Sequence, residues 1–430
     1  MRLATAILLF LIFIFLTVVV VFGVGFGGQG GTLEERWVSD TARDNQVNHH
    51  AVGVSSSGEV IVAPIAAVPN SGVNLTDTSC ALVRLAPSNG SILWRNGVPP
   101  DDCFTHALTE PAIKDIDGDD RHEVISSTTE GAVVAIDAQT GREQFRAPLV
   151  TYGYGRPIVT DIRPEPGSEV ITSDINGNVV LVHADGTVGW RTALNRTFGG
   201  RLSVWDAPSV ADIDADGTRE IVVGTGSGLA VLSSNGTVEW IGKEGGIDTA
   251  IAEVDDDRQT ELFTTKSGTL RSIDGLSTEE EWRRSLGELA RIRTIADGDE
   301  DGTGELYAGL SNGTVVAFDA TNGHMEWKTT ISTSPDAVLT APVVADVDGA
   351  GPPEIVVATR GGTVAVLNPE NGAEVGAYER PVPIWTFVTP GDIDDNGDDE
   401  ILVRYGDGRV IALDYRSMVN LPRSAIMVSG

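Results

Sequence analysis

Four acidic loops that share one spacing are the residues in this sequence best suited to chemistry. The loop Asp212-Ile-Asp-Ala-Asp-Gly-Thr-Arg-Glu220 places side-chain oxygens at positions 1, 3, 5 and 9, and a glycine at position 6 provides a sharp turn. Hard cations such as Ca²⁺ prefer oxygen ligands in this kind of arrangement. Asp and Gly are also ordinary turn residues, but turn formation alone does not explain a spacing that recurs in loop after loop. The predicted calcium ligands are Asp115, Asp117, Asp119 and Glu123; Asp212, Asp214, Asp216 and Glu220; Asp297, Asp299, Asp301 and Glu305; and Asp392, Asp394, Asn396 and Glu400.

Three further copies of this loop are weaker. Ala350 replaces a ligand between Asp348 and Glu354, and the copy over 253–261 is also partial. In the copy that begins at Asp161, Arg163 and Pro164 interrupt the pattern, so no metal is expected there. Any calcium ions in these loops would be structural, with the weak affinity of extracellular calcium modules, about 10⁻⁴–10⁻³ M.

Aromatic residues form a second candidate site. Tyr154, Trp205 and Trp385 each stand seven residues before the opening acid of a repeat. Such rings can stack on a planar cofactor or a sugar, and they are predicted to bind a ligand. The alternative is that they fill a channel or pack between structural units. Arginines in the same stretches could pair with ligand carboxylates or form ordinary salt bridges: Arg156, Arg201, Arg291 and Arg293.

No catalytic motif accompanies these residues. The sequence has neither a Gly-Lys-Ser/Thr phosphate loop nor a Gly-x-Ser-x-Gly elbow. The six histidines show no metal-ligand spacing apart from the adjacent pair His49 and His50. A binding role is therefore favoured over an enzymatic one.

The elements that must position these residues repeat at roughly 40–50 residues, the spacing of propeller blades. Each unit reads as a short apolar strand, the acidic loop, a β-branched strand after the glutamate, a third strand and a fourth strand with an aromatic residue. The fold is predicted to be all-β, a propeller of about eight four-stranded antiparallel blades. The expected blades are 48–108, 109–155, 156–205, 206–247, 248–289, 290–339, 340–385 and 386–430.

Closure of the ring has two candidate strands. The last repeat shows no fourth strand with a tryptophan, whereas the segment 32–39 contains Trp37 in a context similar to that of Trp282. This segment could supply the outer strand of the last blade and cover its open edge. The segment 424–428 is the alternative.

Two families of propeller resemble these repeats. The elements Ile136-Asp-Ala-Gln-Thr-Gly-Arg-Glu-Gln-Phe145 and Phe318-Asp-Ala-Thr-Asn-Gly-His-Met-Glu-Trp327 are similar to the PQQ-like (pyrroloquinoline quinone) repeat. The acidic loops resemble the FG-GAP/VCBS calcium loops of integrin-α-type propellers. The resemblance covers about residues 109–415 and implies calcium in the loops, with quinone chemistry in only some relatives. The vicinal cysteines and the haem motif of many quinoprotein alcohol dehydrogenases are missing, which weakens the enzyme interpretation.

The net charge argues against two classes of binding partner, nucleic acids and anionic membrane surfaces. The formal net charge is −32, with 62 acidic residues against 30 basic ones. Such a surface repels nucleic acids and anionic headgroups. It is typical of proteins from salt-loving microbes, where high salt screens the self-repulsion, and a halophilic archaeon is the expected source.

The N-terminus predicts a membrane anchor. Arg2 precedes an apolar run that is long enough to span a bilayer as a helix, over residues 1–26, and a glycine-rich linker follows over 27–31. A retained anchor is favoured over a cleaved signal, with the propeller (32–430) outside the cell. Cys80 and Cys103 are expected either to form a disulfide or to stay as buried thiols. Glycosylation sequons start at Asn74, Asn89, Asn195, Asn235 and Asn312.

These observations predict a single-pass cell-membrane protein whose extracellular, calcium-binding propeller is a scaffold or binding module for a surface protein or a glycan. The first alternative is a PQQ-dependent dehydrogenase, and the second is an assembly factor for exported proteins, by analogy to eight-bladed propellers with that role.

Overall fold

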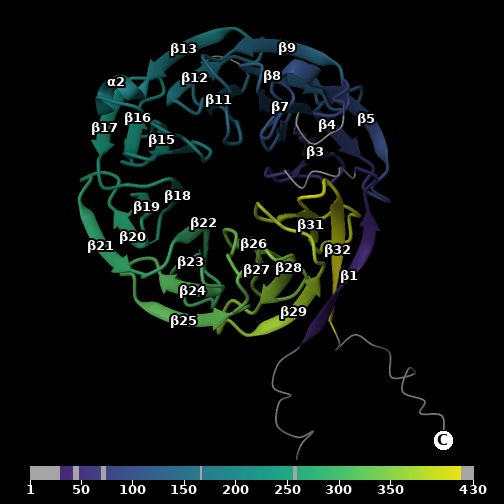
Figure 1. Cartoon of the computed structure of the whole chain (residues 1–430). Helices are drawn as coiled ribbons and strands as arrows, with labels where there is room; N and C mark the ends of the chain where they lie inside the picture. The colour runs from purple at the N-terminus through teal and green to yellow at the C-terminus, as the bar shows by residue number, and fades with distance from the viewer. Residues whose placement is uncertain (1–29, 42–47, 69–73, 165–166, 255–258, 418–430) are drawn as a thin grey trace, which may run out of the picture.

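The computed structural model describes residues 30–41, 48–68, 74–164, 167–254 and 259–417. Eight four-stranded antiparallel sheets stand around a central axis, so the chain is an eight-bladed β-propeller (Figure 1). The predicted anchor (1–26) and linker (27–31) fall almost entirely outside the described residues. Within the described part, no helix is long and apolar enough to cross a membrane.

Seven blades use consecutive strands, which follow one another from the inner edge of each sheet to its outer edge. Blade 1 contains β2 (Gly53–Val54), β3 (Ile61–Ile65), β4 (Ala81–Leu85) and β5 (Ile92–Gly97); blade 2 contains β6 (Ala112–Lys114), β7 (Glu123–Thr128), β8 (Ala132–Asp137) and β9 (Glu143–Pro148). Blade 3 contains β10 (Ile158–Thr160), β11 (Glu169–Ser173), β12 (Asn178–Val182) and β13 (Val188–Ala193); blade 4 contains β14 (Ser209–Ala211), β15 (Glu220–Thr225), β16 (Gly228–Leu232) and β17 (Val238–Gly242). Blade 5 contains β18 (Asp248–Ala252), β19 (Glu261–Lys266), β20 (Thr269–Ile273) and β21 (Glu280–Ser285); blade 6 contains β22 (Ala290–Ala296), β23 (Glu305–Leu310), β24 (Thr314–Asp319) and β25 (Met325–Thr330). Blade 7 contains β26 (Val343–Ala345), β27 (Glu354–Ala358), β28 (Thr363–Leu367) and β29 (Glu374–Glu379).

Blade 8 is built from both ends of the described chain. Its inner strands are β30 (Thr389–Gly391), β31 (Glu400–Arg404) and β32 (Val410–Ser417), and its outer strand is β1 (Gly31–Val38), which pairs antiparallel with β32. Figure 1 shows the purple strand β1 beside the yellow strand β32. The N-terminal segment therefore closes the ring. The alternative segment, 424–428, lies outside the described residues.

The core lies between neighbouring sheets. Middle strands such as β31 are buried along their whole length, because one face packs on the preceding blade and the other on the following blade. One cluster of buried side chains joins Ile61 and Leu85 of blade 1 to Leu402 of blade 8. Among the described residues, two short helices lie outside the sheets, η1 (Pro100–Asp102) and α2 (Leu194–Phe198).

Outer-strand tryptophans lock five of the blades to the next one. The indole Nε1 of Trp37 donates a 2.6 Å hydrogen bond to the Pro87 carbonyl, and its ring packs on Gly90 at the turn of blade 1. Gly90 has φ of 66° and no room for a Cβ atom, so only glycine suits that position. Equivalent bonds run from the indoles of Trp94, Trp190, Trp282 and Trp327 to the carbonyls of Ala138, Ser234, Ala320 and Pro369.

Each outer strand also contains a β-bulge. In blade 6, Phe318 pairs with Met325 and Ala317 with Trp327, so Glu326 has no opposite residue in the ladder. A bulge of this kind redirects the side chain of the extra residue. The register shifts at the same place in all eight blades, and we call the extra residues the bulge residues: Leu93, Gln144, Gly189, Glu239, Glu281, Glu326, Val375 and Arg36.

Candidate functional site

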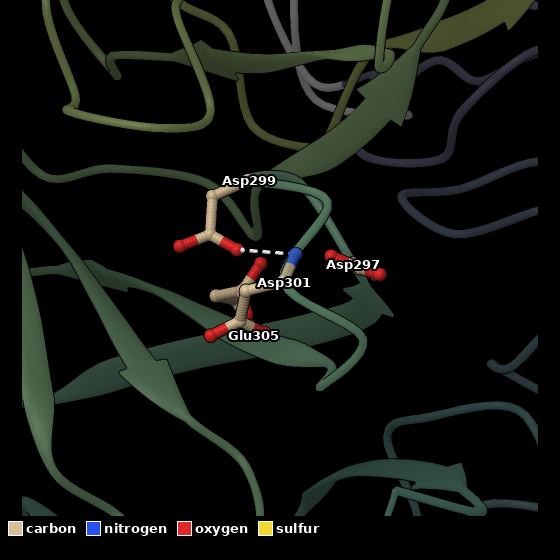
Figure 2. A group of neighbouring side chains, drawn as sticks. All are labelled: Asp297, Asp299, Asp301 and Glu305. Carbon is tan, nitrogen blue, oxygen red and sulfur yellow. Dashed lines mark hydrogen bonds between the residues drawn. The ribbon is translucent and has the colours of Figure 1, made fainter.

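The acidic loops join the first and second strands of their blades, at one end of the channel. In blade 6, ligand oxygens of Asp297, Asp299, Asp301 and Glu305 all lie within 4.8 Å of one another. Figure 2 shows these side chains gathered around the loop, with the Asp301 amide donating a 3.1 Å hydrogen bond to Asp299. This is the one loop among the described residues in which the structure brings all four predicted ligands into such a group.

Three other predicted loops gather their first, third and ninth residues. The groups are Asp115, Asp117 and Glu123; Asp212, Asp214 and Glu220; and Asp392, Asp394 and Glu400. Their fifth residues lie outside these groups and accept a backbone hydrogen bond from the residue two positions on, as Asp301 also does: Asp119 from Arg121, Asp216 from Thr218, and Asn396 from Asp398. Asp346, Asp348 and Glu354, predicted as a partial site, converge in the same way. The loop over 253–261 contains residues 255–258, which lie outside the described part.

The ninth-position glutamate is buried in every acidic loop. In blade 6, Oε2 of Glu305 accepts a 2.7 Å hydrogen bond from the Gly298 amide, whereas its buried Oε1 has no hydrogen-bond partner among the described residues. Burial raises the pKa of Glu305 to about 7, and the charges of Glu326 and Asp299 add to the effect. A buried carboxylate oxygen with no donor, next to three aspartates, fits the hard-oxygen donor set that calcium prefers.

The channel mouth lies at the opposite end of the ring. It is a cavity of about 560 Å³ lined by residues from all eight blades, because each blade's inner strand begins there. The three predicted ligand-binding aromatics, Tyr154, Trp205 and Trp385, all line it. A second cavity of about 450 Å³ continues the channel toward the acidic loops, and both cavities share Glu110 and Arg293.

Two of the three aromatics pack against histidines. The His49 ring stacks on Trp385 at 4.9 Å, and the Arg360 guanidinium lies 4.1 Å from the centre of the same Trp385 ring. Tyr154 makes ring contacts with His50 at 4.7 Å and with His106 at 4.9 Å. Tyr154 and Trp385 thus pack against other side chains of the mouth, as they would if their rings filled the channel.

Trp205 differs from the other two aromatics. Its ring contacts Tyr154 edge-on, yet 39% of the residue remains exposed. Among the mouth aromatics it therefore offers the most open surface for a partner.

Sequence reasoning did not find the histidine cluster. His106 lies more than 50 residues after His49 and His50, in the loop that leads from blade 1 to blade 2, and the fold of the first repeat brings the three imidazoles together, with centroids of His49 and His106 at 4.8 Å. Burial and the neighbouring histidine lower the pKa of His106 to about 4. Burial also lowers the pKa of His50 well below its usual value. The cluster is therefore neutral at pH 7.

Charged residues cross the channel. Glu110 of blade 2 lies 3.7 Å from Arg156 and 3.8 Å from Arg293 of blade 6, on the far side of the ring. Arg291 donates a 2.7 Å hydrogen bond to Asp248. Burial raises the pKa of Asp248 to about 6 and that of Asp206 above its usual value, while the nearby arginines oppose both shifts. The mouth thus pairs the buried carboxylates of Glu110 and Asp248 with arginines that stay partly or largely exposed. Arg201 does not line it.

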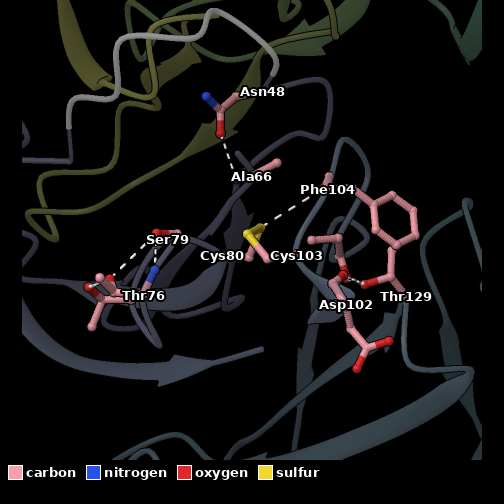
Figure 3. The surroundings of a disulfide bond; sticks show 11 residues. Asn48, Ala66, Thr76, Ser79, Cys80, Asp102, Cys103, Phe104 and Thr129 are labelled. Atoms are coloured by element: carbon pink, nitrogen blue, oxygen red, sulfur yellow. Dashed lines mark hydrogen bonds between the residues drawn. A yellow bond between two sulfur atoms is a disulfide. The ribbon is translucent and has the colours of Figure 1, made fainter. Parts of the chain in front are cut away.

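The disulfide alternative for the two cysteines is realised. Cys80 and Cys103 are bonded, both sulfurs are buried, and the Cα atoms lie 5.4 Å apart (Figure 3). The bond ties β4 of blade 1 to the loop that leads to blade 2.

Comparisons with known proteins agree with this architecture. A family model described as outer membrane protein assembly factor BamB matches residues 162–341 and 266–417, which together span more than half of the chain. This chain belongs to the BamB family. No curated protein matches its sequence.

Several solved structures share the fold of this BamB-family propeller. The crystal structure of BamB from Moraxella catarrhalis superposes with a TM-score of 0.61 at 18% identity, covering 89% of this chain and 98% of that one. Quinohemoprotein alcohol dehydrogenase from Comamonas testosteroni gives 0.60 at 11% identity, covering 89% and 76%. Saccharomyces cerevisiae Sqt1 gives 0.63 at 11% identity, covering 88% and 99%. At these identities the likeness establishes the fold, not the activity.

Proposed function

We propose that this BamB-family propeller is a calcium-stabilised scaffold outside the cell that binds another surface protein or a glycan at its channel mouth. The observation that carries the proposal is the construction of that mouth. All eight blades contribute to it, Trp205 offers an exposed ring, and the arginines Arg291 and Arg293 face carboxylates of this chain. Such a surface can bind a partner, but it shows no nucleophile aligned with a general base among the described residues.

Calcium would be held by the acidic loops at the other end of the ring. When bound, the ion supplies positive charge that neutralises the clustered carboxylates and fixes each loop between its first two strands. In blade 6 the groups positioned for it are Asp297, Asp299, Asp301 and the Oε1 atom of Glu305. The role proposed for calcium is structural.

The location of the protein belongs to the same proposal. Residues 1–26 would anchor the propeller in the membrane, with the ring outside the cell. The Cys80–Cys103 bond supports this placement, because disulfides persist in oxidising compartments. The net charge of −32 supports a high-salt environment, in which screening relieves the repulsion between the many carboxylates.

A quinone-dependent dehydrogenase is the competing function, and the mouth residues fit its cofactor poorly. Pyrroloquinoline quinone carries several carboxylates, which need cations that are free to pair. In this mouth Glu110 already lies beside Arg156 and Arg293, and Asp248 already binds Arg291. Asp206 adds a further acidic group, so Arg360, which stacks on Trp385, is the one mouth arginine without a carboxylate partner among the described residues. A bound polycarboxylate would have to displace these pairs and would crowd negative charge. We therefore derive no catalytic step through a quinone.

An assembly factor for exported proteins is a second form of the scaffold proposal. The family description favours it, since the matching model is described as an outer membrane protein assembly factor. In this form the partner is a protein in the course of export rather than a glycan. The mouth could bind either partner, because exposed aromatic surface binds polypeptide side chains as well as sugar rings.

The deciding experiment for enzyme against scaffold is a quinone titration of the full-length chain in high salt with calcium. Binding is followed optically, and dye reduction is measured with simple alcohols and sugars. We expect neither saturable binding nor turnover from protein whose circular dichroism shows it to be folded. Saturable binding with turnover would refute the scaffold proposal.

A partner at the mouth is tested by crosslinking on intact cells, combined with binding to a panel of oligosaccharides. Trp205→Ala should abolish the crosslinked species or the glycan binding seen with the wild type. Leu276→Ala is the matched control, because Leu276 is also an exposed apolar residue, 57% accessible, but lies on the turn between β20 and β21. Equal binding by both variants would place the partner elsewhere than the mouth.

A further inference from the structure

Two bulge residues form hydrogen bonds with the acidic loop of their own blade. In blade 2, the amide Nε2 of Gln144 donates a 3.1 Å hydrogen bond to Oε1 of Glu123, the ninth residue of the loop. In blade 8, Nη1 of Arg36 donates a 3.2 Å hydrogen bond to Oε1 of Glu400, the equivalent atom. The outer-strand bulge thus brings one side chain of variable type to the same carboxylate oxygen in different blades.

In blade 6 this position holds an acid. Glu326 lies close enough to Asp299 and Asp301 for their charges to act on it, and in its ionised form it has no proton to donate to Oε1 of Glu305. That oxygen has no hydrogen-bond partner among the described residues. In blade 4 the bulge residue is Glu239, again within electrostatic reach of the loop aspartates. These two loops therefore combine the full acidic motif with an additional acidic residue.

In blade 8 the same position holds a cation. Besides Glu400, Nη1 of Arg36 contacts Asp394 at 2.6 Å and Asp414 at 3.5 Å, and only 25% of the arginine side chain is exposed. A guanidinium shared by three carboxylates supplies the positive charge that a metal ion would otherwise provide. The same guanidinium contacts one carboxylate oxygen of each of two predicted calcium ligands, Asp394 and Glu400.

We propose that the bulge residue decides which cation each acidic loop binds: the loops beside Glu239 and Glu326 take calcium, whereas the loop of blade 8 takes Arg36 in its place. This inference rests on the proposed role of calcium in the loops and adds to it. Since Arg36 belongs to β1, the last loop is neutralised by the strand that closes the ring. Ring closure in blade 8 then needs no metal.

Loop-by-loop removal of ligands tests the inference on the full-length chain. Calcium binding is measured by isothermal titration calorimetry in high salt, after chelator treatment. Asp299→Asn should bind one calcium ion fewer per chain than the wild type. Asp394→Asn should bind the same number as the wild type, because its loop holds no metal. If Asp394→Asn also loses an ion, the inference is wrong while the proposed calcium-binding function stands. If the wild type binds no calcium, both fail.

Exchange of the bulge residues gives the converse test. Arg36→Glu should gain one calcium ion per chain, and adding Asp394→Asn to it should remove that ion again. Glu326→Arg should lose one ion. Arg416→Gln is the matched control, because Arg416 also lies in blade 8 and pairs with Glu34 and Asp414 but contacts no loop ligand among the described residues. Unchanged stoichiometry in folded Glu326→Arg would overturn the inference without relying on whether Arg36→Glu folds.

Discussion

Ring closure through Trp37 makes a quantitative prediction. The indole is buried in the core shared by blades 8 and 1, since only 6% of the residue is exposed. Its ring covers Gly90, and its Nε1 donates to the Pro87 carbonyl. Trp37→Ala removes all of this contact and leaves a cavity at the seam between the first and last blades. Trp37→Phe keeps a six-membered aromatic ring and removes the pyrrole part of the indole with its N–H donor, so it leaves a smaller cavity.

The two substitutions should differ in size. Replacing a fully buried tryptophan by alanine costs about 3–5 kcal/mol in lost transfer energy and cavity formation. Loss of the hydrogen bond alone costs about 0.5–1.5 kcal/mol, at the lower end for this pair because Pro87 is partly exposed and water can reach its carbonyl. Trp37→Phe adds to this the loss of a smaller buried volume, so we expect Trp37→Ala to lower the free energy of unfolding clearly more than Trp37→Phe.

Urea unfolding followed by circular dichroism, in constant salt and calcium, measures both values. Trp205→Ala is the control, because that tryptophan is 39% exposed at the mouth and belongs to no seam, so its loss should cost less than about 1 kcal/mol. A cost below about 1 kcal/mol for Trp37→Ala would refute the docking of β1 as the closing strand. Equal costs for the alanine and phenylalanine variants would refute the packing argument.

Four further predictions concern calcium, pH, the disulfide and salt. Asp301→Asn should lower the melting temperature measured by calorimetry in calcium and leave it unchanged in chelator. An equal decrease in both conditions would mean that Asp301 stabilises the fold without binding a metal. Because burial holds the folded-state pKa of His106 near 4 against the usual 6.5, the unfolded chain binds the extra proton between these values, so His106 contributes a slope by which stability falls as the pH drops from about 6.5 to about 4. His106→Gln should flatten that slope in urea titrations at each pH. Cys80→Ser with Cys103→Ser opens a loop with a sequence separation of 23 and should cost about 3 kcal/mol, close to the effect of a reductant on the wild type. The melting temperature should rise with potassium chloride up to molar concentrations, because salt screens a net charge of −32; a flat profile would count against adaptation to high salt.

The sequence by itself determined the all-β class, the four-stranded blades and the position of the acidic loops. These features depend on local patterns. Alternating and continuous apolar runs define the strands, and the spacing of Asp, Gly and Glu sets the shape of a turn within nine residues. Trp37 could also be matched to Trp282 by its neighbours, which pointed to the closing strand that the pairing of β1 with β32 confirms.

The structure decided what lies across the ring. Arg36 and Glu400 are 364 residues apart, and no local pattern shows that one donates to the other. The same holds for Glu110 beside Arg293, since this contact exists only when different blades face one channel. His106 and His49 belong to the first repeat, and their contact forms where its two ends meet at the mouth. Local sequence specifies turns and strands because their partners are near in the chain. The cation that neutralises each loop and the charge balance of the mouth depend on closure, which only the tertiary structure provides.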